Sequence, residues 1–306
     1  MKILILGAGG IGGYFGARLI QAGADVTFLV REARQQLLER AGLQIETPGG
    51  NFSVQPRTVT ATTVQPDYDL IVLAPKAYDL DDALASLARA DARGAILPFL
   101  NGLDHLRVLD ARYGRARVLG GVAHIAATIT PTGAVRQLSP LHRLTVGARD
   151  ATHEALARDF IALCGRADFD SAYSEAIEQV LWNKWVFLAT LAGMTTACQG
   201  SVGEILATPE GEALTRQMFA ECCGVAAAQG QPISAEEQGK ALAMLTQKGS
   251  AFTASMLRDL QGGQRTEHEH ILGDMVRRGQ RAGVGVDLLR LAYTHMAVRS
   301  AQAARG

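Results

Sequence analysis

The chain has 306 residues, of which 48% are hydrophobic, and its 30 Lys and Arg balance its 30 Asp and Glu. This length is too great for one small core and favours two domains of medium size. The even mixture of charges, without a run of five like charges, argues against a nucleic-acid or anionic-membrane surface. We therefore expect small molecules and further copies of the chain as partners.

The N-terminus and the cysteines bear on where the protein works. Met1–Ile5 resembles the start of a signal peptide, but six glycines between Gly7 and Gly16 interrupt the apolar region. The longest apolar stretch, Trp185–Cys198, is shorter than the roughly 20 residues needed to cross a bilayer, so it predicts a buried helix. The four cysteines are too few and too irregularly spaced for a disulfide framework. These features favour a soluble protein of the reducing cytoplasm.

The first half of the chain alternates short β-rich runs with helical patterns, which is typical of a parallel sheet. The expected strands are Lys2–Leu6, Asp25–Val30, Leu70–Leu73, Ala95–Leu97 and Val118–Ala123. Between the first two, Ile11–Ala22 carries apolar residues at helical spacing. Glycine-containing turns at Thr47–Asn51 and Thr130–Gly133 predict two local hairpins.

From about Ala172 the strand patterns stop and helical patterns take over. The expected helices include Ser174–Leu191, Pro209–Ala228 and Ser234–Leu245. We therefore predict a Rossmann-type, doubly wound α/β domain over residues 1–170 and an all-α domain over residues 171–306. No Pro/Ser-rich linker separates the two, so we expect the domains to pack closely and to share a cleft.

A glycine-rich motif follows the first expected strand. Gly7-Ala8-Gly9-Gly10-Ile11-Gly12, here called the glycine loop, matches the G-x-G-x-x-G pattern of dinucleotide-binding sites. In that pattern Gly7 permits a tight turn, Gly9 lets the backbone approach a pyrophosphate, and Gly12 permits close packing of the helix. A purely structural glycine turn is the alternative. The position between a strand and an amphipathic helix favours a bound cofactor.

Arg31 indicates which dinucleotide is bound. It ends the second expected strand, where an NAD-binding enzyme usually carries an acidic residue for the ribose hydroxyls. A guanidinium can bind a 2′-phosphate through two hydrogen bonds, with Arg34 nearby as support, so the sequence favours NADP(H) over NAD(H). A solvated arginine after a strand is the simpler alternative.

Several further segments belong with the glycine loop and Arg31. They are Ala74-Pro75-Lys76-Ala77, Asn101-Gly102, Leu181-Trp182-Asn183-Lys184, Ser255-Met256-Leu257-Arg258-Asp259 and Thr266-Glu267. In order and spacing, the whole set resembles one enzyme family, the ketopantoate reductases (2-dehydropantoate 2-reductases). The resemblance implies a Rossmann N-terminal domain and a helical C-terminal domain, as in 6-phosphogluconate dehydrogenase-like proteins. It also implies NADPH as hydride donor, reduction of a 2-oxo acid, and a place in pantothenate biosynthesis.

Lys184 aligns with the catalytic proton donor of that family. Reduction of a ketone needs a proton for the developing alkoxide. Lys184 lies within the apolar sequence Leu181–Leu191, where partial burial would lower its pKa from about 10.4 toward neutrality. Without the resemblance, a surface lysine on a helix is the simpler interpretation. Glu267 aligns with a family glutamate that contacts the cofactor and helps to set the charge and position of the lysine.

The resemblance assigns four further positions to ligands. Lys76 and Asn101 each follow an expected strand, at the sheet edge where ligands of parallel sheets bind. The family uses this lysine and this asparagine near the nicotinamide and its ribose, and Asn101 is also a candidate for substrate binding. Ala126 aligns with a backbone contact to the cofactor. Ser255 aligns with a serine that hydrogen-bonds the substrate, although most helical serines simply face water.

The helix that carries Lys184 departs from the family pattern. Leu188 and Ala192 follow the lysine by four and eight residues, on one helix face, where the family usually has asparagines that bind the substrate. Val202 replaces a third asparagine. Each lost hydrogen bond to a substrate hydroxyl would cost about 1–3 kcal/mol. We therefore expect Leu188 and Ala192 to line a site for a 2-oxo acid less polar than ketopantoate.

Two other functions stay open, namely a dehydrogenase of the same fold acting on another hydroxy acid and a non-catalytic NADP(H)-binding sensor. Retention of the lysine and the glutamate argues against the sensor. We expect no metal site, because His268 and His270 would point about 200° apart on a helix. The long helices Pro209–Ala228 and Val284–Ala304 could support a homodimer, but they suit packing within one chain equally well.

Overall fold

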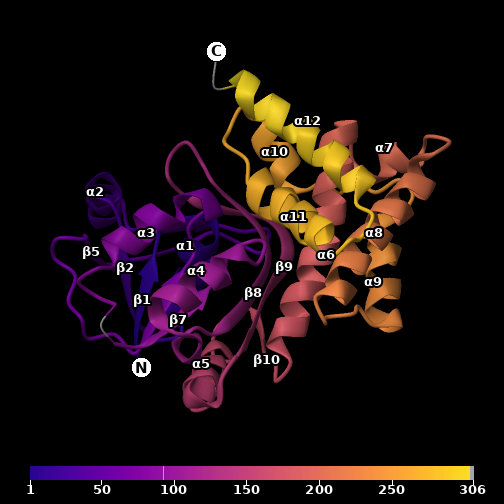
Figure 1. Cartoon of the computed structure of the whole chain (residues 1–306). Helices are drawn as coiled ribbons and strands as arrows, with labels where there is room; N and C mark the ends of the chain where they lie inside the picture. The colour runs from indigo at the N-terminus through magenta and orange to yellow at the C-terminus, as the bar shows by residue number, and fades with distance from the viewer. Residues whose placement is uncertain (92, 304–306) are drawn as a thin grey trace. The chain divides into compact units, whose positions relative to one another are not determined.

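The computed structural model describes residues 1–91 and 93–303. The chain forms two compact units (Figure 1). The first comprises residues 1–100 and 105–178, and the second comprises residues 101–104 together with the chain from residue 179 onward. The sequence did not predict that residues 101–104 pack with the second unit. Our boundary after residue 170 stays a prediction.

A parallel sheet of five strands forms the core of the first unit. Its order is β5-β2-β1-β6-β7. The strands are β1 (Lys2–Leu6), β2 (Asp25–Leu29), β5 (Arg57–Val59), β6 (Leu70–Leu73) and β7 (Ala95–Pro98). All of them but β5 were predicted, because they are short apolar runs buried on both faces. The chain order reverses at β1, so the carboxyl end of β1 is the switch point at which open α/β sheets bind ligands.

Helices accompany the strands of the first unit (Figure 1). They are α1 (Gly10–Gln21), α2 (Glu32–Ala41), α3 (Leu80–Ser86), α4 (Asp104–Tyr113) and α5 (Glu154–Cys164). The predicted helix after the glycine loop is confirmed as α1, which buries Tyr14, Phe15 and Leu19. Each of these side chains contributes roughly 1.5–3 kcal/mol when fully buried. Their burial fixes α1, and with it the glycine loop, against the sheet.

A second sheet completes the first unit, in the order β10-β9-β3-β4, with β8 also pairing with β9. Its strands are β3 (Leu43–Glu46), β4 (Phe52–Val54), β8 (Gly120–Ile129), β9 (Val135–Gly147) and β10 (Asp170–Tyr173). Antiparallel pairing of β3 with β4 and of β8 with β9 confirms the two predicted hairpins. The sequence missed β10, which is short and nowhere fully buried.

The expectation that Val118–Ala123 extends the parallel sheet was wrong. Only Val118 bridges to Ile96 of that sheet, and β8 then pairs with β9 instead. The reason is steric, because Gly120 and Gly121 pass close to other side chains. A Cβ at Gly120 would lie 2.5 Å from Ile177, and a Cβ at Gly121 would lie 2.7 Å from Leu97. These two glycines let the chain cross from one sheet to the other.

The second unit contains helices and no strand among its described residues. Its helices are α6 (Ile177–Cys198, whose first two residues belong to the first unit), α7 (Val202–Leu206), α8 (Gly211–Ala228), α9 (Ala235–Leu245), α10 (Ser255–Gln261), α11 (Asp274–Arg281) and α12 (Asp287–Ala303), with a π-helical turn at Glu269–Gly273. Gly193 lets α6 approach the other helices closely: a Cβ there would lie 2.5 Å from Met218 of α8 and 3.6 Å from Ala292 of α12. The three predicted helices are confirmed, with ends shifted by up to seven residues.

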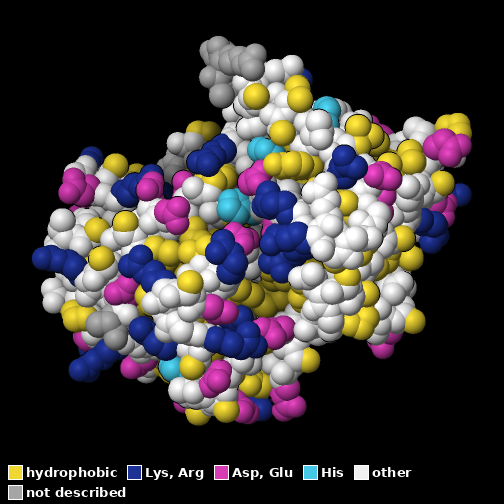
Figure 2. Space-filling model, in the orientation of Figure 1, with side chains coloured by type: hydrophobic (Ala, Val, Ile, Leu, Met, Phe, Trp, Pro, Cys, Tyr) yellow, Lys and Arg dark blue, Asp and Glu magenta, His cyan; other side chains and the backbone are white. Residues whose placement is uncertain are grey.

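The described surface carries mixed charge. Figure 2 shows basic and acidic side chains interspersed over the visible face, with hydrophobic side chains scattered among them. Among residues 1–91 and 93–303, no helix is both long enough and apolar enough to cross a membrane.

An ion cluster centred on the buried guanidinium of Arg149 ties α4 to the start of α6 within the first unit. The guanidinium of Arg149, whose side chain is 4% exposed, donates to both carboxylate oxygens of Asp110, at 2.6 and 2.8 Å, and to Glu178 at 3.1 Å. Replacing Asp110 with Ala should lower the free energy of unfolding by about 3 kcal/mol, because the buried cation loses the partner that accepts two of its hydrogen bonds.

Glu212→Ala is the matched control for Asp110→Ala, since it removes an exposed ion pair with Arg216 within α8. It should cost no more than about 0.5 kcal/mol. Urea denaturation followed by circular dichroism measures both effects. Equal losses of stability in the two variants would contradict the role assigned to Arg149.

Candidate functional site

The glycine loop forms a tight turn at the carboxyl end of β1. Gly7 has a φ of +93°, and its N–H donates to the carbonyl of Leu29 at 3.0 Å. A Cβ at Gly12 would overlap the carbonyl oxygen of Gly7. A Cβ at Gly10 would lie 3.0 Å from the carbonyl oxygen of Ala127. The turn therefore closes only with glycine at positions 7 and 12, and β8 borders the loop at position 10.

The N-terminus of α1 is open for an anion. The helix begins at Gly10 after the N-cap Gly9, no side chain caps it, and its first turn contains no acidic residue. The first backbone N–H groups of a helix have no partner within the helix, and they carry the positive end of its dipole. A diphosphate fits this combination of unpaired donors, glycine backbone and absent negative charge.

The two arginines after β2 have different surroundings. The side chain of Arg31 is 84% exposed, with its nearest carboxylate, Asp82, 4.0 Å away, so its donors are accessible to a ligand. Arg34 is engaged with the backbone. It donates to the carbonyls of Ala8, at 2.9 Å, and Gly133, at 2.7 Å. The expected support of Arg31 by Arg34 is therefore not what the structure shows.

Two further cofactor candidates lie in the first unit. Lys76 precedes a 3-10 turn, Ala77–Asp79, just beyond the carboxyl end of β6. Ala126 lies where the register of β8 against β9 shifts between Ile125 and Ala127. At this irregularity Ala126 has no partner residue in the register of β8 with β9.

In the second unit, Asn101 and Glu267 come together although 166 residues separate them in sequence. The amide of Asn101 donates to Oε2 of Glu267 at 3.1 Å. The neighbouring Gly102 has a φ of +75°, and a Cβ there would lie 2.5 Å from the carbonyl oxygen of His270. Glycine at this position lets the segment 101–104 approach the π-helical turn closely enough for the hydrogen bond to form.

Lys184 and Glu267 interact electrostatically. Glu267 is 4% exposed, and Lys184 lies on α6 between the buried residues Leu181 and Trp185. Desolvation lowers the pKa of Lys184 from 10.5 to about 8, while the negative charge of Glu267 acts in the opposite direction and raises it. An ammonium with a pKa near 8 can release and regain a proton close to neutral pH. The sequence therefore identified three residues, Lys184, Glu267 and Asn101, that the fold connects.

Trp185 fixes the segment that follows Glu267. Its indole N–H donates to the carbonyl of Ile271 within the π-helical turn, at 3.0 Å. Arg278 lies over this indole, 5.3 Å from the ring centroid, and pairs with the buried Asp274 at 3.0 Å. The sequence predicted only that Trp185 begins a buried helical stretch. Nothing local marks the π-helical turn, a feature often found at functional sites.

The predicted substrate residues differ in exposure. Leu188 is partly exposed, whereas Ala192 is completely buried and Val202 nearly so. A ligand reaches Ala192 only if neighbouring side chains move. Ser255 is the first residue of α10, is partly exposed and makes no side-chain hydrogen bond to another described residue, so its hydroxyl is available to a ligand.

The side chains of His268 and Glu269, next to Glu267, are engaged with neighbouring protein groups. His268 shares a hydrogen bond of 2.9 Å with the hydroxyl of Thr266. Glu269 accepts from Tyr293 at 2.6 Å and pairs with Arg277. Within residues 1–91 and 93–303, no group of three His, Cys, Asp or Glu side chains is arranged to hold a metal ion.

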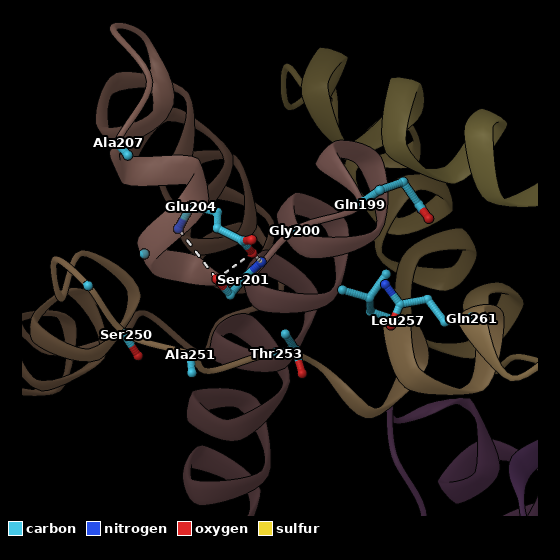
Figure 3. A pocket seen from close by; sticks show the side chains of 12 residues that line it. Gln199, Gly200, Ser201, Glu204, Ala207, Ser250, Ala251, Thr253, Leu257 and Gln261 are labelled. Atoms are coloured by element: carbon cyan, nitrogen blue, oxygen red, sulfur yellow. Dashed lines mark hydrogen bonds between the residues drawn. The ribbon is translucent and has the colours of Figure 1, made fainter.

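A separate hollow of about 670 Å³ lies beside the loop between α6 and α7 (Figure 3). None of the predicted site residues lines it. Its polar side chains include Gln199, Ser250 and Thr253. Its one carboxylate, Glu204, is used in a capping box with Ser201, with hydrogen bonds drawn in Figure 3. The hollow thus offers no spare ionised group for catalysis.

Comparison with known families decides which chemistry this arrangement belongs to. The family model for ketopantoate reductase PanE/ApbA matches residues 3–151, and that for the ketopantoate reductase PanE/ApbA C terminal matches residues 176–300. The chain belongs to the ketopantoate reductase family. It is therefore an oxidoreductase, with the α/β and helical parts that this family combines.

Individual relatives agree with the family. The chain is 32% identical over 303 residues to the "Uncharacterized oxidoreductase YkpB" of Bacillus subtilis (strain 168), covering 99% of this chain and 100% of that protein. It is 29% identical over 283 residues to the 2-dehydropantoate 2-reductase of Archaeoglobus fulgidus, covering 92% of each. The crystal structure of 2-dehydropantoate 2-reductase from Methylococcus capsulatus superposes with a TM-score of 0.89 at 27% identity, covering 100% of this chain and 99% of the other.

The fit of Gly12 against Gly7 generates a prediction. Gly12→Ala should weaken binding of a reduced nicotinamide dinucleotide about tenfold or more, because about 1.4 kcal/mol of strain in the turn already corresponds to a factor of ten. Titration followed by cofactor fluorescence measures the change. Gly239→Ala is the matched control, since a Cβ at Gly239 meets no atom within 4 Å. Unchanged affinity in Gly12→Ala would show that the close approach is irrelevant to binding.

Proposed function

We propose that the protein reduces a 2-oxo acid to a 2-hydroxy acid with NADPH, and that Lys184 is the general acid. The observation that carries this proposal is the environment of Lys184. Desolvation, opposed in part by the negative charge of Glu267, leaves its pKa at about 8. The buried carboxylate of Glu267 in turn accepts a hydrogen bond from Asn101. A catalytic acid works best when its pKa lies near the operating pH.

A bound dinucleotide would supply the hydride for the carbonyl carbon of the substrate. The ammonium of Lys184 donates a proton to the carbonyl oxygen as its negative charge develops, which yields the 2-hydroxy acid. Lys184 is then a neutral amine, and it regains a proton from solvent before the next turnover. Before the transfer, its positive charge also polarises the carbonyl.

Glu267 and Asn101 prepare Lys184 for this step. The carboxylate of Glu267 offsets part of the desolvation that lowers the pKa of the lysine, so that the ammonium is populated at neutral pH. The hydrogen bond from Asn101 holds that carboxylate in one orientation. We assign Glu267 and Asn101 a second role in contacting the cofactor, as in the family that the chain resembles.

Residues of the first unit provide the other proposed contacts to the cofactor. The backbone N–H groups of the glycine loop, from Gly7 to Gly12, would hold the pyrophosphate at the open helix terminus. Arg31, with its exposed guanidinium, would hold the 2′-phosphate and so favour NADPH over NADH. We add Lys76 as a contact near the nicotinamide and its ribose, and Ala126 as a contact to the cofactor through its own backbone.

The substrate that fits best is a 2-oxo acid with a less polar side chain than ketopantoate. Ser255 offers a hydroxyl for the carboxylate, and the partly exposed Leu188 offers an apolar surface one helical turn beyond Lys184. Ketopantoate, and with it a role in pantothenate biosynthesis, is the more polar case within this class. We also propose a homodimer, for which the exposed α12 side chains Leu291, at 65%, and Val298, at 50%, are the candidate contacts.

The pKa of Lys184 predicts a pH profile. For reduction, kcat/KM should fall above a pH of about 8, since the ammonium is the active form and is lost as pH rises through its pKa. Glu267→Gln removes the charge that raises this pKa, so the fall should begin at a lower pH. Lys184→Ala should lose about 10²- to 10⁴-fold in rate and should lack this limb.

Stopped-flow measurement of NADPH oxidation across pH 6–10 tests this prediction. Glu212→Gln, on the exposed face of α8, is the control and should keep the wild-type profile. A basic limb that persists in Lys184→Ala, or that moves to higher pH in Glu267→Gln, would exclude Lys184 as the general acid.

Substrate choice is tested by replacing Leu188 with Asn. An amide at this position can pair with a substrate hydroxyl, so kcat/KM should rise about tenfold for ketopantoate and fall for 2-oxo acids with simple alkyl chains. Steady-state kinetics with a panel of 2-oxo acids measures both. Efficient turnover of ketopantoate by the wild-type chain, well above the alkyl acids, would overturn the preference. Absence of turnover with every member of the panel would favour the sensor.

A further inference from the structure

Arg34 joins the glycine loop to a distant turn of the same unit. One terminal nitrogen of its guanidinium donates to the carbonyl of Ala8, inside the loop, and the other donates to the carbonyl of Gly133, in the turn between β8 and β9. Its third donor, Nε, is buried and has no hydrogen-bond partner among the described residues. Because Nε has no exposed surface, it cannot reach a ligand in solution.

The bond to Ala8 acts on the phosphate-binding backbone. The peptide that joins Ala8 and Gly9 is planar and trans, so its C=O and the N–H of Gly9 point in opposite directions. Fixing the carbonyl against Arg34 therefore directs the N–H of Gly9 away from the arginine. Gly9 is the N-cap of α1. Glycines neighbour this peptide and leave its orientation free, because they tolerate many backbone conformations.

The turn is built to receive the guanidinium. Gly133 has a φ of +85°, and a Cβ there would lie 2.9 Å from the guanidinium and 2.5 Å from Leu37. The turn is itself held by hydrogen bonds from the N–H groups of Ala134 and Gly133 to Thr130. Only glycine gives Arg34 both the carbonyl and the space beside it, so Arg34 and Gly133 act as one unit.

We propose that Arg34 is a positioning residue that orients the glycine loop for the pyrophosphate of the cofactor, while Arg31 alone selects the 2′-phosphate. This inference rests on the proposed binding of NADP(H) at the loop. It separates two arginines that the sequence places only three residues apart. Arg34 then affects every ligand that contains a pyrophosphate, whereas Arg31 affects only ligands that carry a 2′-phosphate.

Arg34→Met keeps most of the side-chain volume and removes the donors. The dissociation constants of NADPH and NADH should both rise about tenfold, with their ratio unchanged. The dissociation constant of adenosine 2′-monophosphate, which lacks a pyrophosphate, should stay within about twofold of the wild-type value. Arg31→Met is the matched variant. It should weaken the binding of NADPH and adenosine 2′-monophosphate and leave the binding of NADH unchanged. Isothermal titration calorimetry measures all three ligands.

Gly133→Ala provides an independent variant, because it keeps Arg34 but obstructs its approach to the turn. It should reproduce the Arg34→Met pattern, and the double variant should be no weaker than either single one. If Arg34→Met fails to fold, Gly133→Ala gives the same readout.

Two results would overturn the inference. A selective loss of affinity for NADPH and adenosine 2′-monophosphate in Arg34→Met would show that Arg34 binds the 2′-phosphate itself. Unchanged affinity for both dinucleotides would show that the contact of Arg34 with the glycine loop is irrelevant to binding. Failure of the wild-type chain to bind either dinucleotide would overturn the proposed function as well, so the two failures are distinguishable.

Discussion

The buried carboxylate of Glu267 is the group on which the candidate site in the second unit depends. A charge with 4% of its residue exposed is costly unless partners compensate it. The fold supplies the amide of Asn101 from a segment far away in sequence and the ammonium of Lys184 from α6. To bring these together, residues 101–104 leave the first unit, and the indole of Trp185 fixes the turn that follows Glu267.

A different constraint governs the first unit, where backbone geometry replaces charge. The glycine loop closes because Gly7 adopts a positive φ and Gly12 has no Cβ. Its donors belong to the main chain, so side chains can influence it only by holding the backbone in place. Arg34, on α2, does this by joining the loop to a turn that the sequence treats as an ordinary hairpin connection. Specificity for the cofactor can therefore be separated from the geometry that binds it.

Periodic patterns made much of the fold predictable. The strand–loop–helix at the N-terminus was expected because buried apolar runs, glycine spacing and helical periodicity agree there. Three features were not expected, namely the crossing of the chain between the sheets at Gly120 and Gly121, the strand Asp170–Tyr173 and the π-helical turn. Each depends on contacts with residues far away in sequence. For the site, sequence reasoning identified Lys184, Glu267 and Asn101 through a family resemblance. It gave no sign that Arg34 binds backbone carbonyls, because the exposure of a side chain and the identity of its hydrogen-bond partners depend on the tertiary structure.

The most direct test of the account is the titration of Lys184 itself. Nitrogen-15 labelling of lysine side chains, with Lys184→Arg to assign the resonance, gives the pKa of this ammonium by nuclear magnetic resonance in the intact protein. The account predicts a value of about 8, which Glu267→Gln lowers further. A resonance that titrates near the ordinary value of 10.5, or that does not respond to Glu267→Gln, would contradict it.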